Sequence, residues 1–176
     1  MAELDISNVN FLIAEDNPFM QAILKQLLRA FGVRNIREAN DGSQAYNILH
    51  TFHPDIILVD WEMAPVSGID FVKLVRTADD SPDRFIPMIM VTGHSEQARV
   101  TEARDAGINE ILIKPVSAVS LYQRIRSVIE RPRQYVESRD YFGPDRRRRD
   151  DPRYTGPERR ADAEQEIAYI DGPEDA

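Results

Sequence analysis

Residues 55–60, with the sequence Asp-Ile-Ile-Leu-Val-Asp, constrain the fold more than any other stretch of the chain. Four consecutive apolar residues, three of them β-branched, predict a strand that is buried on both faces. The strand ends at Asp60, and the residues that follow include Pro65 and Gly68, which indicate a loop. Because open α/β sheets bind their ligands outside the carboxyl ends of the strands, Asp60 is a candidate site residue.

Four further stretches have the same strand-like character, and amphipathic stretches alternate with them. These predicted strands cover residues 9–14, 33–39, 86–91 and 108–113. Apolar residues recur at helical spacing after each strand, and Asn17 and Ser117 are expected to cap two of the helices. Five strand–helix alternations predict an α/β domain over residues 1–130. Its sheet would be doubly wound, five-stranded and parallel, with helices on both faces.

Composition excludes several classes of protein. The sequence contains no cysteine, which excludes disulfide bonds and thiolate metal sites. No apolar run approaches the roughly 20 residues of a membrane-spanning helix, so we expect no membrane insertion. The first residues do not resemble a secretion signal, so we expect a cytoplasmic protein. A formal net charge of -8 argues against a general DNA-binding or RNA-binding protein.

Polar residues follow four of the predicted strands. Glu15 and Asp16 follow the first strand and Asp60 ends the third, so three carboxylates are expected to meet in one crevice. Carboxylates gathered in this way repel one another, and Mg²⁺ is a hard cation that such oxygens bind. Thr92 and Lys114, at the ends of the fourth and fifth strands, add a hydroxyl and an ammonium group. Together these groups could hold a phosphoryl group on Asp60.

Each of these residues could also have an ordinary structural role. An acidic pair after a strand often starts a helix, and a threonine at a strand end is usually structural. A lysine before a proline is usually exposed in a loop. Their joint occurrence at four strand ends favours the functional interpretation. The set resembles a response-regulator receiver domain over residues 9–130, through Glu15-Asp16, Asp60, Gly68, Thr92-Gly93 and Lys114-Pro115.

This resemblance implies a flavodoxin-like sheet with strand order 2-1-3-4-5, and a signalling protein rather than an enzyme. It implies that Asp60 takes a phosphoryl group from a phosphohistidine on a histidine kinase or phosphotransfer protein. It also implies that Asp16 and Asp60 bind Mg²⁺ with help from Glu15. Thr92 and Lys114 would contact the phosphoryl group.

The chain departs from the receiver pattern at two places. Ile111 stands where the family often has an aromatic switch residue, and Ala64 intervenes between Met63 and the loop proline. The site could therefore work while its usual read-out is altered. Glu62 and His94 flank the expected phosphoryl position, and we interpret both as surface residues.

Beyond residue 130 the composition changes. Apolar residues become sparse, so we expect residues 131–176 to form a tail that is mostly disordered when free, with a short helix over 161–170. Every basic residue of this tail is an arginine. A repeat with the pattern Tyr-x-Gly-Pro-acid-Arg-Arg occurs at residues 141–147 and again at residues 154–160.

The planar fork of arginine matches a phosphate or the O6/N7 edge of guanine, and its face stacks on bases, as tyrosine does. Two copies of such a motif suit a ligand with two equivalent halves, such as cyclic di-GMP. Two alternatives stay open, because a charged terminus is commonly a solvated disordered tail and an arginine run commonly binds nucleic acid without specificity. The repeat weakens the disordered-tail alternative, and the interleaved acidic residues weaken the nucleic-acid alternative.

A receiver followed by such a segment is similar to the CheY-like cyclic di-GMP effectors. In that family the tail binds cyclic di-GMP, and the liganded protein acts on the flagellar motor switch protein. The resemblance implies a cyclic di-GMP site formed by Tyr141, Asp145, Arg146, Arg147, Arg148, Arg149, Tyr154, Glu158, Arg159 and Arg160. The role of Arg148 and Arg149 is less defined, because the second repeat has no counterpart to them.

Two functional hypotheses follow from the sequence. The first is a signalling protein whose tail binds cyclic di-GMP and which then regulates the flagellar motor. The second is a single-domain response regulator that only relays phosphate, with an incidental tail. A transcription factor is disfavoured, because no helix-turn-helix pattern follows residue 130.

Overall fold

A computed structural model of the chain describes residues 4–146 and 168–170. In this part of the chain strands and helices alternate as predicted. The strands of the main sheet are β1 (Asn10–Ala14), β2 (Asn35–Ala39), β3 (Ile56–Asp60), β4 (Met88–Thr92) and β5 (Glu110–Ile113). The helices are α1 (Pro18–Ala30), α2 (Gly42–Phe52), α3 (Gly68–Thr77), α4 (Gln97–Ala106) and α5 (Ala118–Glu130).

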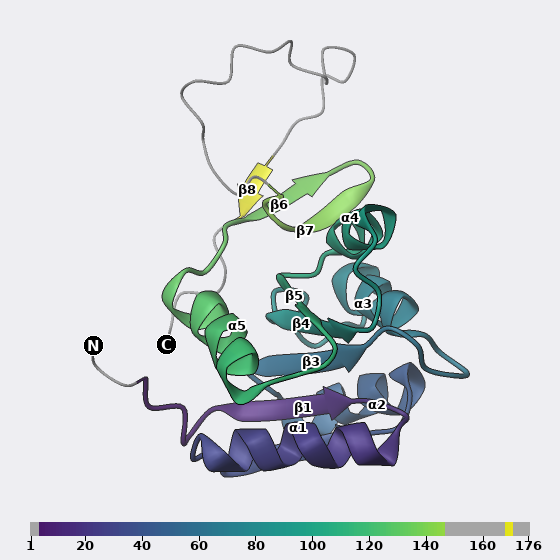
Figure 1. Cartoon of the computed structure of the whole chain (residues 1–176). Helices are drawn as coiled ribbons and strands as arrows, with labels where there is room; N and C mark the ends of the chain where they lie inside the picture. The colour runs from purple at the N-terminus through teal and green to yellow at the C-terminus, as the bar shows by residue number, and fades with distance from the viewer. Residues whose placement is uncertain (1–3, 147–167, 171–176) are drawn as a thin grey trace.

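The main sheet has the strand order β2-β1-β3-β4-β5, and every pair in it is parallel. This confirms the predicted doubly wound, flavodoxin-like fold. One core cluster joins the sheet to α2, α3 and α4, and a second joins it to α1 and α5 (Figure 1). All five residues of β3 are buried, as the apolar run at its centre predicts.

Local sequence signals start two of the helices. The side chain of Asn17 accepts hydrogen bonds from the backbone nitrogens of Phe19 and Met20, and Pro18 occupies the first turn of α1. Ser117 and Ser120 form a reciprocal capping box at the start of α5. Both predicted N-caps are therefore confirmed.

A second, antiparallel sheet follows α5. It contains β6 (Tyr135–Ser138), β7 (Tyr141–Pro144) and β8 (Ala168–Ile170), in the order β7-β6-β8. The expectation that the tail is mostly disordered from residue 131 is therefore wrong for the hairpin of β6 and β7. The expected helix is wrong at Ala168–Ile170, which is a strand, and the rest of its predicted span lies outside the described residues.

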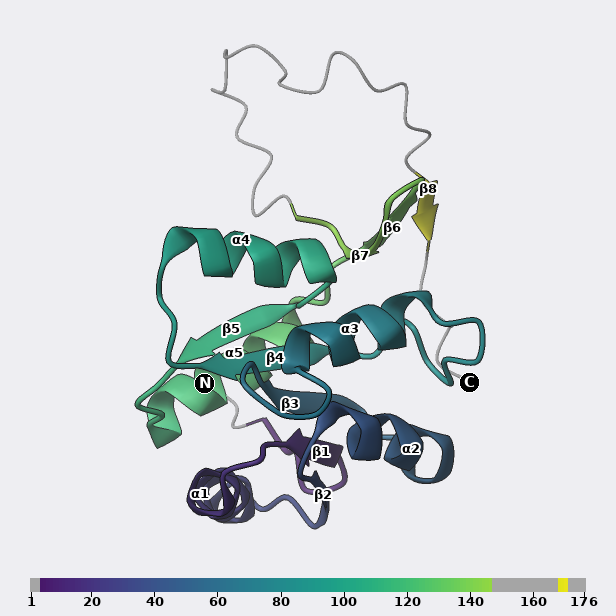
Figure 2. The same cartoon turned by 90° about the vertical axis from the view of Figure 1, so that its right-hand side faces the viewer.

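The hairpin packs on the parallel-sheet domain through two aromatic side chains. Tyr135 and Phe142 are buried, and both rings lie in edge or tilted contact with each other and with Phe85. The guanidinium of Arg84 lies 3.5 Å from the centre of the Phe142 ring. Figure 2 shows β7 beside the C-terminal end of α4 and above α3. These aromatic contacts bury apolar surface that the sparse composition of the segment did not suggest.

Arg76, in the last turn of α3, is 1% exposed and supports the same region. Its guanidinium donates hydrogen bonds to the carbonyl oxygens of Gly107, Arg84 and Ile86 and to Oδ1 of Asn109, over distances of 2.7 to 3.0 Å. The ring of Tyr135 lies 5.2 Å from the guanidinium carbon. Burial lowers the pKa of Arg76, and the neutral oxygens offset part of the free energy that burying its charge requires.

Two glycines allow the hairpin to approach the turn between α4 and β5. Gly107 ends α4 with φ of +105°, a conformation that a residue with a side chain rarely adopts. A Cβ atom on Gly143 would lie 3.0 Å from the Cα atom of Gly107. The backbone of β7 therefore lies directly against this turn, at the amino ends of the parallel strands.

Candidate functional site

A cleft of about 480 Å³ opens at the carboxyl ends of the parallel strands. All of the predicted receiver-site residues lie in it. It is lined by Glu15, Asp16, Asn17, Asp60, Trp61, Glu62, Thr92, Gly93, His94 and Lys114. The strand order explains this meeting, because β1, β3, β4 and β5 are consecutive in the sheet and all end on the same edge.

Three carboxylates form the acidic part of the cleft. One oxygen each of Glu15, Asp16 and Asp60 lies within 4.8 Å of the others, with Glu15 and Asp60 buried and Asp16 exposed. Oxygen donors at this spacing, with one side open to water, fit Mg²⁺, which binds a few carboxylates and keeps several waters. The predicted cation ligands are therefore brought together by the fold.

Lys114 connects Asp60 to Glu15 across the acidic cluster. Its Nζ atom donates hydrogen bonds to Oδ1 of Asp60 over 2.8 Å and to Oε2 of Glu15 over 3.2 Å. Burial tends to lower the pKa of Lys114, but the hydrogen bonds and charges of Asp60 and Glu15 outweigh it and raise the pKa. The lysine is therefore a fixed positive charge beside Asp60.

Burial has the opposite effect on the two carboxyl groups. It raises the pKa of both Asp60 and Glu15, although Lys114 acts to lower each of them. The ionised cluster therefore has a desolvation penalty that one ammonium group does not fully offset. A divalent cation would relieve this penalty, which is a second reason why the residues present fit Mg²⁺.

The loop after β3 fixes the position of Asp60. The backbone nitrogen of Glu62 donates a hydrogen bond to Oδ2 of Asp60 over 3.1 Å. Gly68 starts α3 so close to the strand that a Cβ atom there would lie 1.9 Å from the carbonyl oxygen of Asp60. Glycine is therefore required at this position for the start of α3 to lie against the backbone of Asp60.

Thr92 and His94 form the opposite wall. Thr92 is buried, and its Oγ1 accepts a hydrogen bond from the backbone nitrogen of His94 over 3.0 Å. The Nε2 atom of His94 lies 2.7 Å from Oε1 of Glu62, and this hydrogen bond lowers the pKa of the Glu62 carboxyl. Glu62 and His94, interpreted from the sequence as surface residues, thus form a polar contact across the rim of the cleft. Ile111, at the position where the family often has an aromatic switch residue, is half-buried and packs against the core.

The predicted tail residues that the structure describes are Tyr141, Asp145 and Arg146, and none of them lines this cleft. The hydroxyl of Tyr141 donates a hydrogen bond to the carbonyl oxygen of Pro144 over 2.8 Å, and burial raises the pKa of Tyr141 to about 12. The guanidinium carbon of Arg146 lies 4.2 Å from the centre of the Tyr141 ring. The remaining predicted residues lie outside the described part of the chain: Arg147, Arg148, Arg149, Tyr154, Glu158, Arg159 and Arg160.

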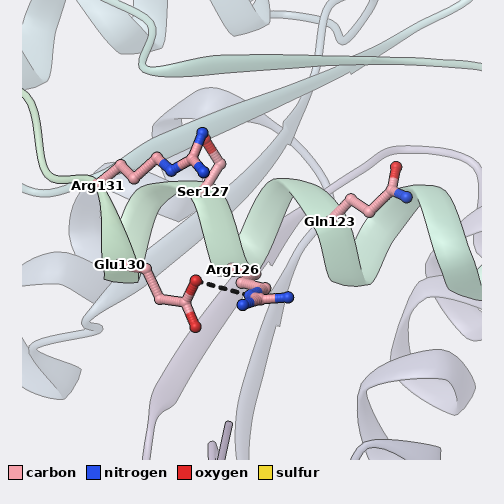
Figure 3. Close-up of a pocket in the computed structure, with 5 residues that line it drawn as sticks. All are labelled: Gln123, Arg126, Ser127, Glu130 and Arg131. Atoms are coloured by element: carbon pink, nitrogen blue, oxygen red, sulfur yellow. Dashed lines mark hydrogen bonds and ion pairs between the residues drawn. The ribbon is translucent and has the colours of Figure 1, made fainter. Parts of the chain in front are cut away.

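A separate hollow of about 310 Å³ lies along α5. Figure 3 shows its lining, in which Arg126 and Glu130 form an ion pair of 2.6 Å. None of the predicted site residues belongs to it.

The strand order and the groups at the strand ends define a flavodoxin-like signalling domain with a cluster of three carboxylates that fits a cation. The chain belongs to the response regulator receiver domain family, whose pattern it matches over residues 11–126. It is 36% identical to the chemotaxis protein CheY of Pseudomonas aeruginosa over 123 residues, which are 70% of this chain and 98% of that protein.

Two further comparisons agree. The chemotaxis protein CheY-3 of Vibrio cholerae is 34% identical over 124 residues, 70% of this chain and 94% of that protein. The structure of a Francisella response regulator receiver domain superposes with a TM-score of 0.63 at 25% identity, covering 70% of this chain and 98% of that one. The family match ends before β6, so the hairpin lies outside it. Within the residues that the structure describes, no helix is long and apolar enough to span a membrane.

Proposed function

We propose that this receiver accepts a phosphoryl group on Asp60, from a phosphohistidine on a histidine kinase or phosphotransfer protein. The observation that carries this proposal is the position of Lys114, within 2.8 Å of Asp60 and 3.2 Å of Glu15. In the transfer, a carboxylate oxygen of Asp60 forms a new bond to phosphorus. The bond between phosphorus and the donor imidazole nitrogen breaks, and the electron pair returns to that nitrogen.

The residues of the cleft have distinct parts in this transfer. Lys114 and the Thr92 hydroxyl face the position where negative charge accumulates on the phosphoryl oxygens. Glu15, Asp16 and Asp60 would hold Mg²⁺, which supplies positive charge to the same oxygens when it is bound. The backbone nitrogen of Glu62 holds Asp60 in the orientation that presents a carboxylate oxygen to the cleft.

The test is phosphorylation by acetyl phosphate with Mg²⁺, read as the gain of one phosphoryl group by intact-protein mass spectrometry. The wild type is expected to gain the group, and Asp60→Asn is expected to gain none. Asp55→Asn is the matched control, because Asp55 lies just before the other end of β3 and binds the backbone nitrogen of Asn10. Labelling of Asp60→Asn to the wild-type level would remove Asp60 from the proposal.

The tail supports a second function. We propose that it binds cyclic di-GMP and that the liganded protein is recruited to the flagellar motor and regulates it through the motor switch protein. The repeated motif is the main support. The stacking of Arg146 on Tyr141 adds to it, because a guanidinium paired with an aromatic ring is the combination that binds a purine face and edge. Two relatives of this chain are chemotaxis proteins, which is consistent with an output at the motor.

Calorimetric titration with cyclic di-GMP tests the ligand. The double variant Arg147→Ala/Arg160→Ala is expected to lose binding, whereas Arg29→Ala/Arg99→Ala, which removes two arginines from helices of the receiver, is expected to bind like the wild type. GMP at the same concentration is the control for a single guanine. Equal affinity of the tail variant and the wild type would exclude the tail as the site.

The alternative is a phosphate relay with an incidental tail. A chain that ends at Arg146 keeps β6 and β7 and removes Arg147, the second repeat and β8. If the tail is incidental, this shortened chain keeps every cellular function of the full chain, including control of motility. If the ligand proposal holds, the shortened chain is phosphorylated normally but neither binds cyclic di-GMP nor recruits the motor switch protein.

A further inference from the structure

Arg146, the first arginine of the first repeat, is held against the receiver. Its Nη1 atom lies 2.5 Å from Oδ1 of Asp105, which is in the last turn of α4. The same guanidinium also lies over the ring of Tyr141, with its carbon 4.2 Å from the ring centre. One N–H donor of the Arg146 guanidinium and one of its planar faces are therefore already in contact with other groups of the protein.

The neighbouring backbone explains why Arg146 lies there. Phe142 is 4% exposed and anchors β7, and the backbone nitrogen of Asp145 donates a hydrogen bond to the carbonyl oxygen of Gln134 over 2.7 Å. Arg146 directly follows this fixed stretch, so its side chain starts from a defined point beside α4. The second repeat has Thr155 at the position that corresponds to Phe142.

The groups that Arg146 uses toward Asp105 are those that it would use toward a nucleotide. A carboxylate and a phosphate take the same N–H donors of the guanidinium, so one bond excludes the other at a given donor. The carboxylate of Asp105 would also repel a ligand with two phosphate charges at this distance.

We propose that Asp105 competes with cyclic di-GMP for Arg146, so that the last turn of α4 opposes ligand binding at the first repeat. This inference rests on the cyclic di-GMP function proposed above. Binding at this half-site replaces the Asp105–Arg146 ion pair with a phosphate–Arg146 ion pair, and the α4 carboxylate is released to water. Any change that breaks the Asp105–Arg146 ion pair therefore raises the affinity for cyclic di-GMP. By linkage, binding of cyclic di-GMP weakens that ion pair by the same factor.

The expected gain in affinity for cyclic di-GMP follows from the solvent exposure of the two side chains in the ion pair. Asp105 and Arg146 are both partly exposed, with side-chain exposures of 52% and 34%, and such ion pairs contribute little. Asp105→Asn is therefore expected to bind cyclic di-GMP about two- to fivefold more tightly than the wild type at low ionic strength. The gain is expected to shrink as salt is added, because exposed charges are screened.

The experiment is calorimetric titration of full-length variants with cyclic di-GMP at two salt concentrations. Glu102→Gln is the matched control, because it removes one negative charge from α4 three residues away and leaves Asp105 in place. The gain in Asp105→Asn should exceed the change in Glu102→Gln. In a double-mutant cycle, it should disappear when Arg146→Ala is already present.

Three outcomes are distinguishable. If neither the wild type nor Asp105→Asn binds, the proposed ligand is wrong. If the wild type binds and Arg147→Ala/Arg160→Ala does not, but Asp105→Asn binds like the wild type, the ligand stands and the competition is overturned. A gain in Asp105→Asn that persists in the Arg146→Ala background also overturns the competition, because the carboxylate would then act without this arginine.

Discussion

Replacing Phe142 with alanine is expected to release the hairpin of β6 and β7 from the receiver without unfolding the parallel sheet. Phe142 is 4% exposed and packs against Phe85, Tyr135 and the guanidinium of Arg84. It belongs to neither of the two core clusters that join the helices to the sheet. The loss should therefore be local.

The magnitude follows from the contacts that are lost. Truncation of a buried phenylalanine to alanine costs about 3–5 kcal/mol, and the contact with Arg84 adds roughly 0.5–1 kcal/mol. Taking the lower end, about 3 kcal/mol, the population of the undocked hairpin rises by about two powers of ten, because each 1.4 kcal/mol is roughly tenfold. Backbone amides paired between β6 and β7 should then exchange about 100-fold faster.

Hydrogen exchange followed by mass spectrometry measures this directly. Phe19→Ala is the matched control, because Phe19 is 80% exposed on α1 and its truncation should change stability by less than about 0.5 kcal/mol. Unchanged exchange in the hairpin of Phe142→Ala would refute the role of Phe142 as an anchor. Equal acceleration in β1, β3 and β4 would refute the claim that the hairpin is a separate unit.

Three further predictions concern the receiver itself. Without Mg²⁺ at neutral pH, Asp60→Asn should raise the free energy of unfolding in urea, because burial raises the pKa of Asp60 and its ionised form destabilises the fold. This gain in stability should fade as the pH falls through the raised pKa, because the wild-type carboxyl then becomes protonated. A gain that is constant with pH would contradict this explanation. Arg76→Met should lower the free energy of unfolding by about 3–5 kcal/mol, because it leaves buried carbonyl oxygens without donors. Arg29→Met, on the exposed side of α1, should lower it by no more than about 1 kcal/mol. Gly68→Ala should abolish labelling by acetyl phosphate and destabilise the fold by about 1–3 kcal/mol, because its Cβ atom would overlap the Asp60 carbonyl, and normal labelling of Gly68→Ala would refute the stated fit. Gly93→Ala, whose Cβ atom would meet no protein atom within 4 Å, should leave the free energy of unfolding unchanged.

The parallel sheet and its cleft were predictable because their signals are local and strong. A run such as that of β3 is apolar at every interior position, so it indicates a strand buried on both faces. Once the strands are placed, the parallel arrangement brings their carboxyl ends to one edge. The meeting of Asp60, Thr92 and Lys114 then follows without any knowledge of side-chain contacts.

The hairpin was missed because its signal is weak in composition. Tyr135 and Phe142 supply its buried anchors among many charged residues. The pattern of two short stretches with β-branched or aromatic residues around the polar turn at Arg139 and Asp140 could have indicated it.

The burial of Arg76 had no signal in the sequence, because an arginine in the last turn of a helix usually complements the helix dipole at the surface. Its burial depends on carbonyl groups from two other segments, residues 84–86 and Gly107, which sequence periodicity does not reveal.

Helix α4 runs from the cleft proposed for phosphorylation to the hairpin next to the proposed cyclic di-GMP site. It begins at Gln97, three residues after His94 on the rim of the cleft, and it ends beside Gly107, where the hairpin rests (Figure 2). Ten residues of α-helix rise about 15 Å, so the helix separates the rim of the cleft from the turn at Gly107 by roughly that distance. The two proposed sites therefore lie at opposite ends of one helix. Only Ala103 and Ala106 of α4 are buried, so few core contacts oppose a tilt or slide of this helix that would link the cleft to the hairpin.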